Sequence, residues 1–301
     1  MSSIWTVGEV LIDLIPTSAG GDRTPVVGGG PANTAKALAR LGFESYFVDG
    51  ISSDDYGQMC RTELLNDGVK LDHAPTIAKP TALAIVSLND AGSASYQFKL
   101  DETATFDFSR DWLPDPSNPP SVLHVGTLGT LIEPGASILF DWAQEVSAPI
   151  VYDPNIRTSI LSDRDKYLSS VVKWSALAKV VKMSDDDAQW LFPGKDFATI
   201  AQTFISMGVE LVVITLGADG IVGFTSRGEV KVPGVKVTVA DTVGAGDTVG
   251  AILVEAIVAY GIHNLHGEQL ESTLKRAAQA AAITCSRAGA KPPTKAELGE
   301  C

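Results

Sequence analysis

Short apolar runs separated by helix-like patterns make up most of the chain. The runs at 122–125, 150–152, 180–183 and 211–216 are rich in valine, leucine and isoleucine, as buried strands of a parallel sheet are. Segments with apolar residues at helical spacing follow these runs. This alternation predicts one α/β domain with a central sheet of mostly parallel strands.

The first forty residues predict a strand, a glycine turn and a helix. Residues 4–15 have the composition of one extended strand, and a polar connection leads from it to the glycines at 28–30. Pro31 suits the first position of a helix, and Gly42 is typical of the position just beyond a helix end. The glycines therefore come directly before a helix start.

Two strand-like runs interrupt the α/β pattern. Residues 81–88 and 93–100 alternate between apolar and polar positions, and Asn89, Asp90, Ala91 and Gly92 lie between them. This is favourable chemistry for a hairpin turn. A hairpin inside an α/β chain suggests a small β lid that projects from the main sheet.

Polar residues follow several of the predicted central strands. They occur at 153–157, 184–187 and 215–217. Ligands of open α/β sheets bind beyond the carboxyl ends of the strands. We therefore expect these segments to contribute to a binding site.

Composition excludes several classes of function. The chain has 301 residues, of which 45% are hydrophobic and 20% charged, so it is long enough to bury a large core. Its formal net charge of −13 would repel a nucleic-acid backbone, and no Lys/Arg-rich run offsets that charge locally. Nucleic acid is therefore not expected as a partner.

The chain also lacks the signals of secretion and of membrane insertion. Cys60, Cys285 and Cys301 are widely separated and form no CxxC pair, so neither a disulfide framework nor a zinc site is expected. No segment is apolar over the length needed to cross a bilayer, and the N-terminal run contains Glu9 and Asp13 without a basic leader. These features predict a cytoplasmic protein.

The segment 241–248 is the strongest candidate for chemistry. Its glycines precede apolar residues at helical spacing, so backbone amides of Gly244, Ala245 and Gly246 can surround an anion at a helix N-terminus. Asp247 would lie beside that anion, where its carboxylate could accept a proton from a hydroxyl. Alternatively, the glycines make only a tight turn and Asp247 caps the helix. The spacing alone does not decide between the two, and the chain has no GxxxxGK[ST] loop.

Two further features are open to a functional and a structural interpretation. Gly29 and Gly30 permit close approach of a ligand to the backbone, with Asn33 in the first turn of the helix, but an ordinary turn would need the same residues. Asp13 lies within an apolar strand, where a carboxylate needs a partner or a ligand unless it is at a solvated strand end.

Taken together, these segments resemble the ribokinase-like (PfkB-type) family of carbohydrate kinases, and most closely its fructokinase branch. The resemblance rests on GEVLIDLIP at 8–16, GGGPANTAKALARLG at 28–42, DPNIR at 153–157, ITLGADG at 214–220 and DTVGAGDT at 241–248. It covers nearly the whole chain. It implies one domain over 1–301, a three-layer α/β/α sandwich, and a small β-sheet lid formed by segments at about 12–28 and 81–108.

The resemblance also implies roles for individual residues. Asp247 would be the general base, and the amides of Gly244, Ala245 and Gly246 would stabilise the transferred phosphoryl group. The sugar would contact Asp13, Gly29, Gly30, Asn33 and Arg157, as well as Asp247. ATP would contact Lys182, Ser184, Thr215, Gly217, Gly220 and Gly246.

Cation sites follow from the same resemblance. Asp187 would approach Mg²⁺ through water, although Ser184 and Asp187 stand where many members have Asn and Glu. A monovalent cation, K⁺, would bind near Asp241, Val243 and Gly289.

The resemblance predicts the substrate class more sharply than the individual sugar. We expect phosphorylation of D-fructose to fructose 6-phosphate, with aminoimidazole riboside, ribose and 2-keto-3-deoxygluconate as alternatives. A non-catalytic sugar-binding relative is the alternative from another class. The lid is expected to pair two subunits in a homodimer.

Overall fold

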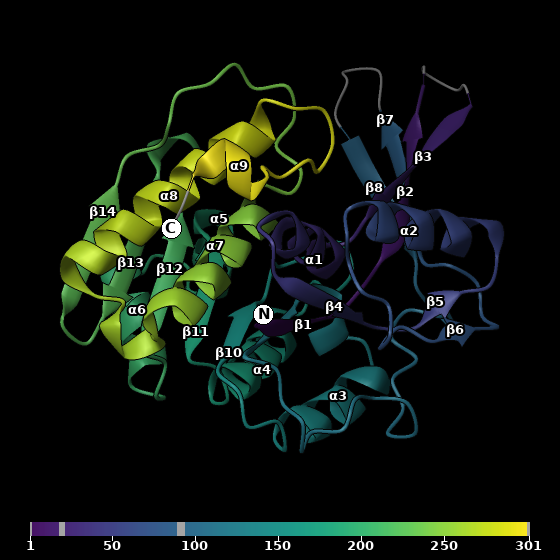
Figure 1. Ribbon diagram of the computed structural model, residues 1–301, viewed down its shortest axis with the longest axis horizontal. Coiled ribbons are helices and arrows are strands. Elements are labelled where there is room, and N and C mark those ends of the chain that lie inside the picture. The colour runs from purple at the N-terminus through teal and green to yellow at the C-terminus, as the bar shows by residue number, and fades with distance from the viewer. Residues whose placement is uncertain (1, 18–21, 89–93, 300–301) are drawn as a thin grey trace.

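An eight-stranded sheet crosses the centre of the computed structural model (Figure 1), which describes residues 2–17, 22–88 and 94–299. Its strand order is β14-β13-β12-β11-β10-β9-β1-β4. The strands are β1 (Ser3–Val7), β4 (Glu44–Val48), β9 (Val122–Gly126), β10 (Ile150–Asp153), β11 (Val180–Ser184), β12 (Leu211–Thr215), β13 (Ile221–Thr225) and β14 (Gly228–Val232). Only the pairs β12–β13 and β13–β14 are antiparallel among these. The predicted parallel core is therefore confirmed.

Helices cover both faces of this sheet. One face packs against α1 (Gly30–Arg40), α7 (Ala245–Tyr260) and α8 (Gly267–Cys285), and the other against α3 (Gly135–Ala143), α4 (Arg164–Ser175), α5 (Asp185–Leu191) and α6 (Phe197–Ile205). Along β12, Val213 packs with the first group of helices while Val212 and Ile214 pack with the second. Successive strand residues point to opposite faces, so a run that is apolar throughout requires helices on both sides. The three-layer α/β/α fold expected from the sequence is confirmed.

A second, small sheet lies beside the central one, at the upper right of Figure 1. Its order is β3-β2-β7-β8, with β2 at Leu11–Pro16, β3 at Arg23–Gly28, β7 at Leu83–Leu88 and β8 at Ala94–Lys99. Strands β7 and β8 pair antiparallel from Leu83 opposite Lys99 to Leu88 opposite Ala94, which confirms the predicted hairpin. Its predicted turn at 89–92 lies outside the described residues.

The remaining elements are short or peripheral. They are β5 (Ile51–Ser52), β6 (Thr76–Ile77), α2 (Asp55–Asn66), α9 (Lys295–Leu298), and the 3₁₀ turns η1 (Thr127–Thr130), η2 (Gly217–Asp219) and η3 (Ile262–Asn264). Within the described parts of the chain, none of the helices combines the length and apolarity that crossing a bilayer requires.

The single strand predicted over 4–15 is wrong, because the chain turns at Gly8. Strand β1 belongs to the central sheet and β2 to the small one, and Gly8 between them has φ 138°. A Cβ at Gly8 would lie 2.4 Å from Cγ of Pro31, at the start of α1. The polar connection at 23–28 also pairs with β2, as β3. Glycine at residue 8 thus lets the chain leave one sheet for the other directly against α1.

Replacing Gly8 with alanine should therefore destabilise the fold more than replacing Gly42, which also has a positive φ but has nothing within 4 Å of its Cβ position. We expect Gly42→Ala to cost about 1–2 kcal/mol from backbone conformation alone. Gly8→Ala should cost about 2–5 kcal/mol, because overpacking against Pro31 adds to the backbone term. Urea unfolding of both variants measures the difference, and equal costs would contradict the close contact.

Candidate active site

A cavity of about 500 Å³ lies where the small sheet meets the carboxyl ends of the central strands. Its walls come from the segments after β1, β9 and β10, from β11, from the small sheet, and from the starts of α1 and α7. The lining residues are Glu9, Leu11, Asp13, Gly28, Gly29, Gly30, Asn33, Phe98, Thr127, Leu128, Asn155, Arg157, Ser159, Lys182, Thr242, Val243, Gly244, Gly246 and Asp247. The structure therefore brings together all the residues predicted to contact the sugar.

Asp247 lies in the first turn of α7 and contacts the start of α1. Asn33 Nδ2 donates a 2.9 Å hydrogen bond to Asp247 Oδ2, and the hydroxyl of Thr34 donates to the backbone oxygen of Asp247 at 3.4 Å. Helix α7 begins after Gly244, which has φ 79° and supplies no capping side chain. The alternative interpretation, that Asp247 is the helix cap, is wrong, because Asp247 lies inside the helix and Gly244 occupies the cap position.

Lys182 places a positive charge next to this carboxylate. Its Nζ donates a 2.6 Å hydrogen bond to Asp153 Oδ2, and both side chains are buried. A Cβ on Gly246 would lie 2.9 Å from Lys182 Nζ, so the ammonium group reaches the first turn of α7. Burial acts to lower the pKa of Lys182, but the charges of Asp153 and Asp247 outweigh it and raise that pKa. Lys182 therefore remains a cation on the cavity wall.

Burial makes the cavity carboxylates unusually basic. It raises the pKa of Asp247 to about 6, although the Lys182 charge and the Asn33 hydrogen bond act in the opposite direction. Burial also raises the pKa of Asp13 to about 6, partly offset by the charge of Arg157. A carboxylate with a pKa near 6 is ionised at neutral pH and accepts a proton more readily than an ordinary one.

The predicted anion site at the start of α7 is partly engaged by the protein itself. Ala245 N donates to the carbonyl of Thr242 at 3.3 Å, and the hydroxyl of Thr248 donates to the carbonyl of Gly244 at 2.8 Å. Gly244 and Gly246 both line the cavity. The positive end of the α7 dipole thus faces the same space as Asp247 and Lys182.

Of the residues predicted to contact ATP, Lys182 and Gly246 line the cavity, and the others lie at or just beyond the carboxyl ends of β11 and β12. Ser184 and Thr215 are adjacent in register on these strands, and Gly217 follows in η2. Gly220 also has a structural reason to be glycine, because its φ is 107° and a Cβ would lie 2.0 Å from the carbonyl oxygen of Val232. These residues lie along the carboxyl-terminal edge of the central sheet, beyond the cavity and on the side of Lys182.

Asp187, the predicted magnesium residue, has a structural role at the start of α5. Its side chain forms a capping box with Ser184, in which Ser184 N donates to Oδ2 at 3.0 Å and Ser184 Oγ accepts from Asp187 N. Asp187 Oδ1 accepts a 2.9 Å hydrogen bond from Ile156 N. Each carboxylate oxygen has a second lone pair, so the residue fits a water-mediated contact with Mg²⁺.

The segments predicted to bind a monovalent cation are adjacent in the structure. Asp241 Oδ1 accepts a hydrogen bond from Val243 N at 3.1 Å, and Asp241 Oδ2 accepts one from Gly289 N at 2.9 Å. Asp241 therefore joins the chain before α7 to the turn after α8. Throughout the described ranges, no cluster of three or more His, Cys, Asp or Glu side chains is arranged to hold a metal.

Sequence reasoning did not assign Glu9, Thr127 and Asn155, which also line the cavity. Glu9 is 2% exposed, and its Oε2 accepts a 3.1 Å hydrogen bond from Leu128 N. Burial raises the pKa of Glu9 to about 7. The argument applied to Asp13, a carboxylate within an apolar segment, would have identified Glu9 as well.

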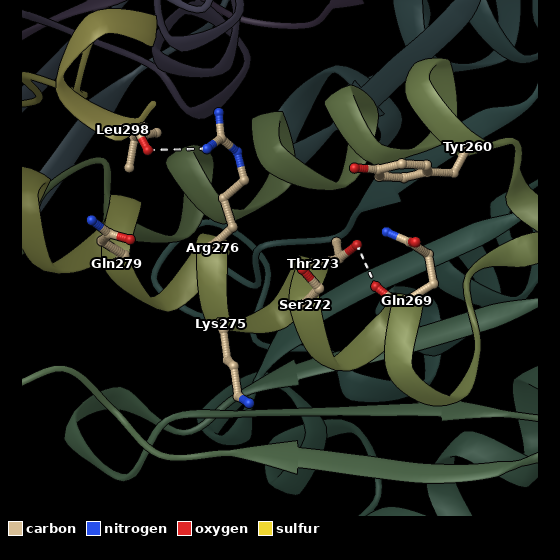
Figure 2. A pocket seen from close by; sticks show the side chains of 8 residues that line it. All are labelled: Tyr260, Gln269, Ser272, Thr273, Lys275, Arg276, Gln279 and Leu298. Atoms are coloured by element: carbon tan, nitrogen blue, oxygen red, sulfur yellow. Dashed lines mark hydrogen bonds between the residues drawn. The ribbon is translucent and has the colours of Figure 1, made fainter. Parts of the chain in front are cut away.

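A second pocket lies between α7, α8 and α9, where the C-terminal helix α9 packs against α8 (Figure 2). Arg276 donates to both carboxylate oxygens of the buried Glu255, at 2.7 and 3.0 Å. It also donates to the carbonyls of Leu298 and Gly299, at 3.3 and 3.0 Å. Arg276 thus anchors α9 to α8, and we assign this pocket a structural role.

The high pKa of Glu9 predicts a pH-dependent stability. Because the native state holds the Glu9 proton up to about pH 7, it binds more protons than the unfolded state between about pH 4.5 and 7, so stability falls as pH rises through this window. Glu9→Gln removes this term while keeping an acceptor for Leu128 N. The unfolding free energy of the variant minus that of the parent should therefore rise by about 3 kcal/mol from pH 4 to pH 8. Urea unfolding at both pH values tests this, and a constant difference would contradict it.

Comparison with known proteins agrees with this geometry. Residues 1–297 match the model of the pfkB family carbohydrate kinases. A fructokinase from Rhizobium leguminosarum bv. trifolii is 35% identical over 254 residues, which cover 82% of this chain and 77% of that protein.

Solved structures give the same result. A fructokinase from Xylella fastidiosa with bound ATP superposes with a TM-score of 0.90 at 26% identity, covering 98% of this chain and 96% of that one. A fructokinase from Vibrio cholerae O395 with fructose, ADP and calcium ion has a TM-score of 0.83 at 28% identity, covering 99% and 98%. The resemblance noted from the sequence motifs is confirmed, and this chain belongs to the pfkB family of carbohydrate kinases.

Proposed function

We propose that the protein transfers the γ-phosphoryl group of ATP to the 6-hydroxyl of D-fructose, with Asp247 as the general base. The observation that carries this proposal is the position of Asp247, between the Asn33 amide and the Lys182 ammonium on the wall of a polar cavity. The fructokinases similar to this chain support the choice of sugar and of nucleotide.

The chemistry follows from where the charges lie. Asp247 takes the proton of the attacking hydroxyl, the hydroxyl oxygen bonds to the γ-phosphorus, and ADP leaves with the electrons of the broken bond. Negative charge on the transferred group is stabilised by Lys182 and by the positive end of α7, with the amides of Gly244 and Gly246 at the cavity, whereas the predicted Ala245 amide already donates to the Thr242 carbonyl. The burial of Lys182 on the cavity wall strengthens its interactions with these charges.

The other side of the cavity suits a polyol. Asp13 can accept hydrogen bonds from two hydroxyl groups, and Gly28 opposite it leaves room, since a Cβ there would lie 2.3 Å from Asp13 Oδ2. Gly29, Gly30 and Asn33 bring backbone and amide groups of the α1 start to the same ligand. Arg157 supplies the cation that faces Asp13.

The nucleotide and the cations are proposed to bind along the adjoining sheet edge. ATP would pass Lys182 and Gly246 and extend over Ser184, Thr215, Gly217 and Gly220. Asp187 would hold Mg²⁺ through water, and the ion would supply further positive charge beside the phosphates. K⁺ would bind beside Asp241, Val243 and Gly289, whose hydrogen bonds already hold the two chain segments together.

We further propose that the small sheet closes over the sugar as a lid and pairs two subunits in a homodimer. Strands β3 and β8 are its edges, and an edge strand offers backbone groups to a second chain. Ile15 on β2 is 43% exposed, which supports contact with a partner subunit. Cys60 and Cys285, the cysteines within the described residues, are free thiols, as is usual for proteins of the cytoplasm, where we propose this protein acts.

A coupled ATPase assay with a panel of acceptors tests the proposed reaction. Fructose should be turned over with the highest kcat/KM, ahead of ribose, aminoimidazole riboside and 2-keto-3-deoxygluconate. Asp247→Asn should lower kcat at least about 10³-fold because it removes the base, while nucleotide affinity stays within about threefold. An unchanged rate in this variant would exclude Asp247 as the base. A higher kcat/KM with another acceptor would show that fructose is not the preferred substrate.

The raised pKa of Asp247 predicts the acid limb of the pH profile. Since Asp247 must be ionised and Asp13, which contacts the sugar, has a similar pKa, kcat/KM for the sugar should fall by at least about tenfold per pH unit below about pH 6. The Asn33 hydrogen bond favours the charged carboxylate, so Asn33→Ala should move this limb to higher pH. A limb that stays in place in Asn33→Ala would show that another group is titrating.

A further inference from the structure

Two residues that line the cavity have backbone conformations that side chains disfavour. Thr127, directly after β9, has φ 53°, and Asn155, two residues beyond the end of the adjacent strand β10, has φ 41°. A β-branched residue at positive φ is a clear outlier, and asparagine tolerates this region better. Such strain persists only where the surrounding structure enforces it, and it concentrates at functional sites.

The same device enforces both conformations. The residue after Thr127, Leu128, donates its backbone N–H to the buried carboxylate of Glu9 at 3.1 Å. The residue after Asn155, Ile156, donates its backbone N–H to the buried carboxylate of Asp187 at 2.9 Å. Two buried carboxylates thus fix two neighbouring turns that glycine would make without strain.

The side chains that these turns present converge on Asp247. Asn155 Nδ2 donates to Thr127 Oγ1 at 3.4 Å. The Cβ position of Gly30 lies 2.9 Å from Thr127 Oγ1, 3.1 Å from Asn155 Nδ2 and 3.2 Å from Asp247 Oδ1. Oδ2 of Asp247 accepts from Asn33, so Oδ1 is the oxygen that faces the Thr127 and Asn155 pair.

We propose that Thr127 is a catalytic residue, whose hydroxyl holds the acceptor hydroxyl of the sugar against Oδ1 of Asp247, and that Asn155 positions Thr127. The inference rests on the proposed function and extends it to Thr127, which lies outside the sequence motifs, and to Asn155, which lies within DPNIR but had no role assigned. Because Asn155 donates to Thr127 Oγ1, the Thr127 hydroxyl keeps its own proton to donate elsewhere, and Thr127 lines the cavity. The proton of the acceptor hydroxyl then passes to Asp247 Oδ1, and the hydroxyl oxygen forms the new bond to the γ-phosphorus.

Glycine substitutions separate this role from a structural one. Thr127→Gly and Asn155→Gly remove the polar groups but suit the positive φ, so the melting temperature should stay level or rise. We expect kcat/KM for the sugar to fall about 100-fold in Thr127→Gly and about 10-fold in Asn155→Gly, with KM for ATP within twofold. Thr127→Ser, which retains the hydroxyl, should keep kcat/KM within about threefold of the parent.

Glu102→Gly is the matched control. Glu102 is an exposed residue outside the cavity lining with φ 51°, so this substitution serves as the control for the backbone effect on stability and should change the melting temperature in the same direction. Glycine variants of Thr127 and Asn155 that keep kcat/KM within threefold would overturn the inference while the proposed function stands. Loss of activity in step with a lowered melting temperature would also overturn it. A parent protein inactive on every acceptor would overturn the proposed function, and this inference with it.

Discussion

The contact between Asn33 and Asp247 is the constraint on which the site depends. These residues begin α1 and α7, which are separated by most of the chain but pack on the same face of the central sheet. The contact requires both helices to start at the same height, directly above the carboxyl ends of the strands. Gly8 and Gly30 make this possible, because a Cβ at either residue would touch the neighbouring segment. The geometry of the candidate site is therefore a consequence of how closely these backbone segments approach one another.

The charges of the site are balanced within a few residues. Lys182 is shared between Asp153, which it contacts directly, and Asp247, whose pKa it lowers. An unpaired charge at this depth would be costly, and an ammonium between two carboxylates avoids that cost. The arrangement also explains why Asp247 ends with a pKa near 6. Burial makes the carboxylate basic, and Lys182 keeps it ionised at neutral pH.

Much of the fold could be predicted from the sequence because apolar runs on β9 to β12 require two helical layers. The prediction failed where a backbone property decided the outcome, as at Gly8, where one apolar stretch is divided between two sheets. It also missed the antiparallel β13, which contains Gly223, and β14, in which charged residues alternate with valine. The residues of the site were found where a motif carried them. Thr127 was not found, because its conformation depends on the hydrogen bond between Leu128 N and Glu9, which are 119 residues apart in the sequence.

Asp187 shows how one residue can satisfy two interpretations of a motif. The pattern Ser184-x-x-Asp187 is a capping box by sequence, and the structure forms that box. The same carboxylate also accepts from Ile156 N and so holds the turn at Asn155. An aspartate that caps α5 is drawn back toward the helix, whereas a longer glutamate would extend farther from it. The carboxylate of Asp187 therefore ties the start of α5 to the turn that presents Asn155 to the cavity.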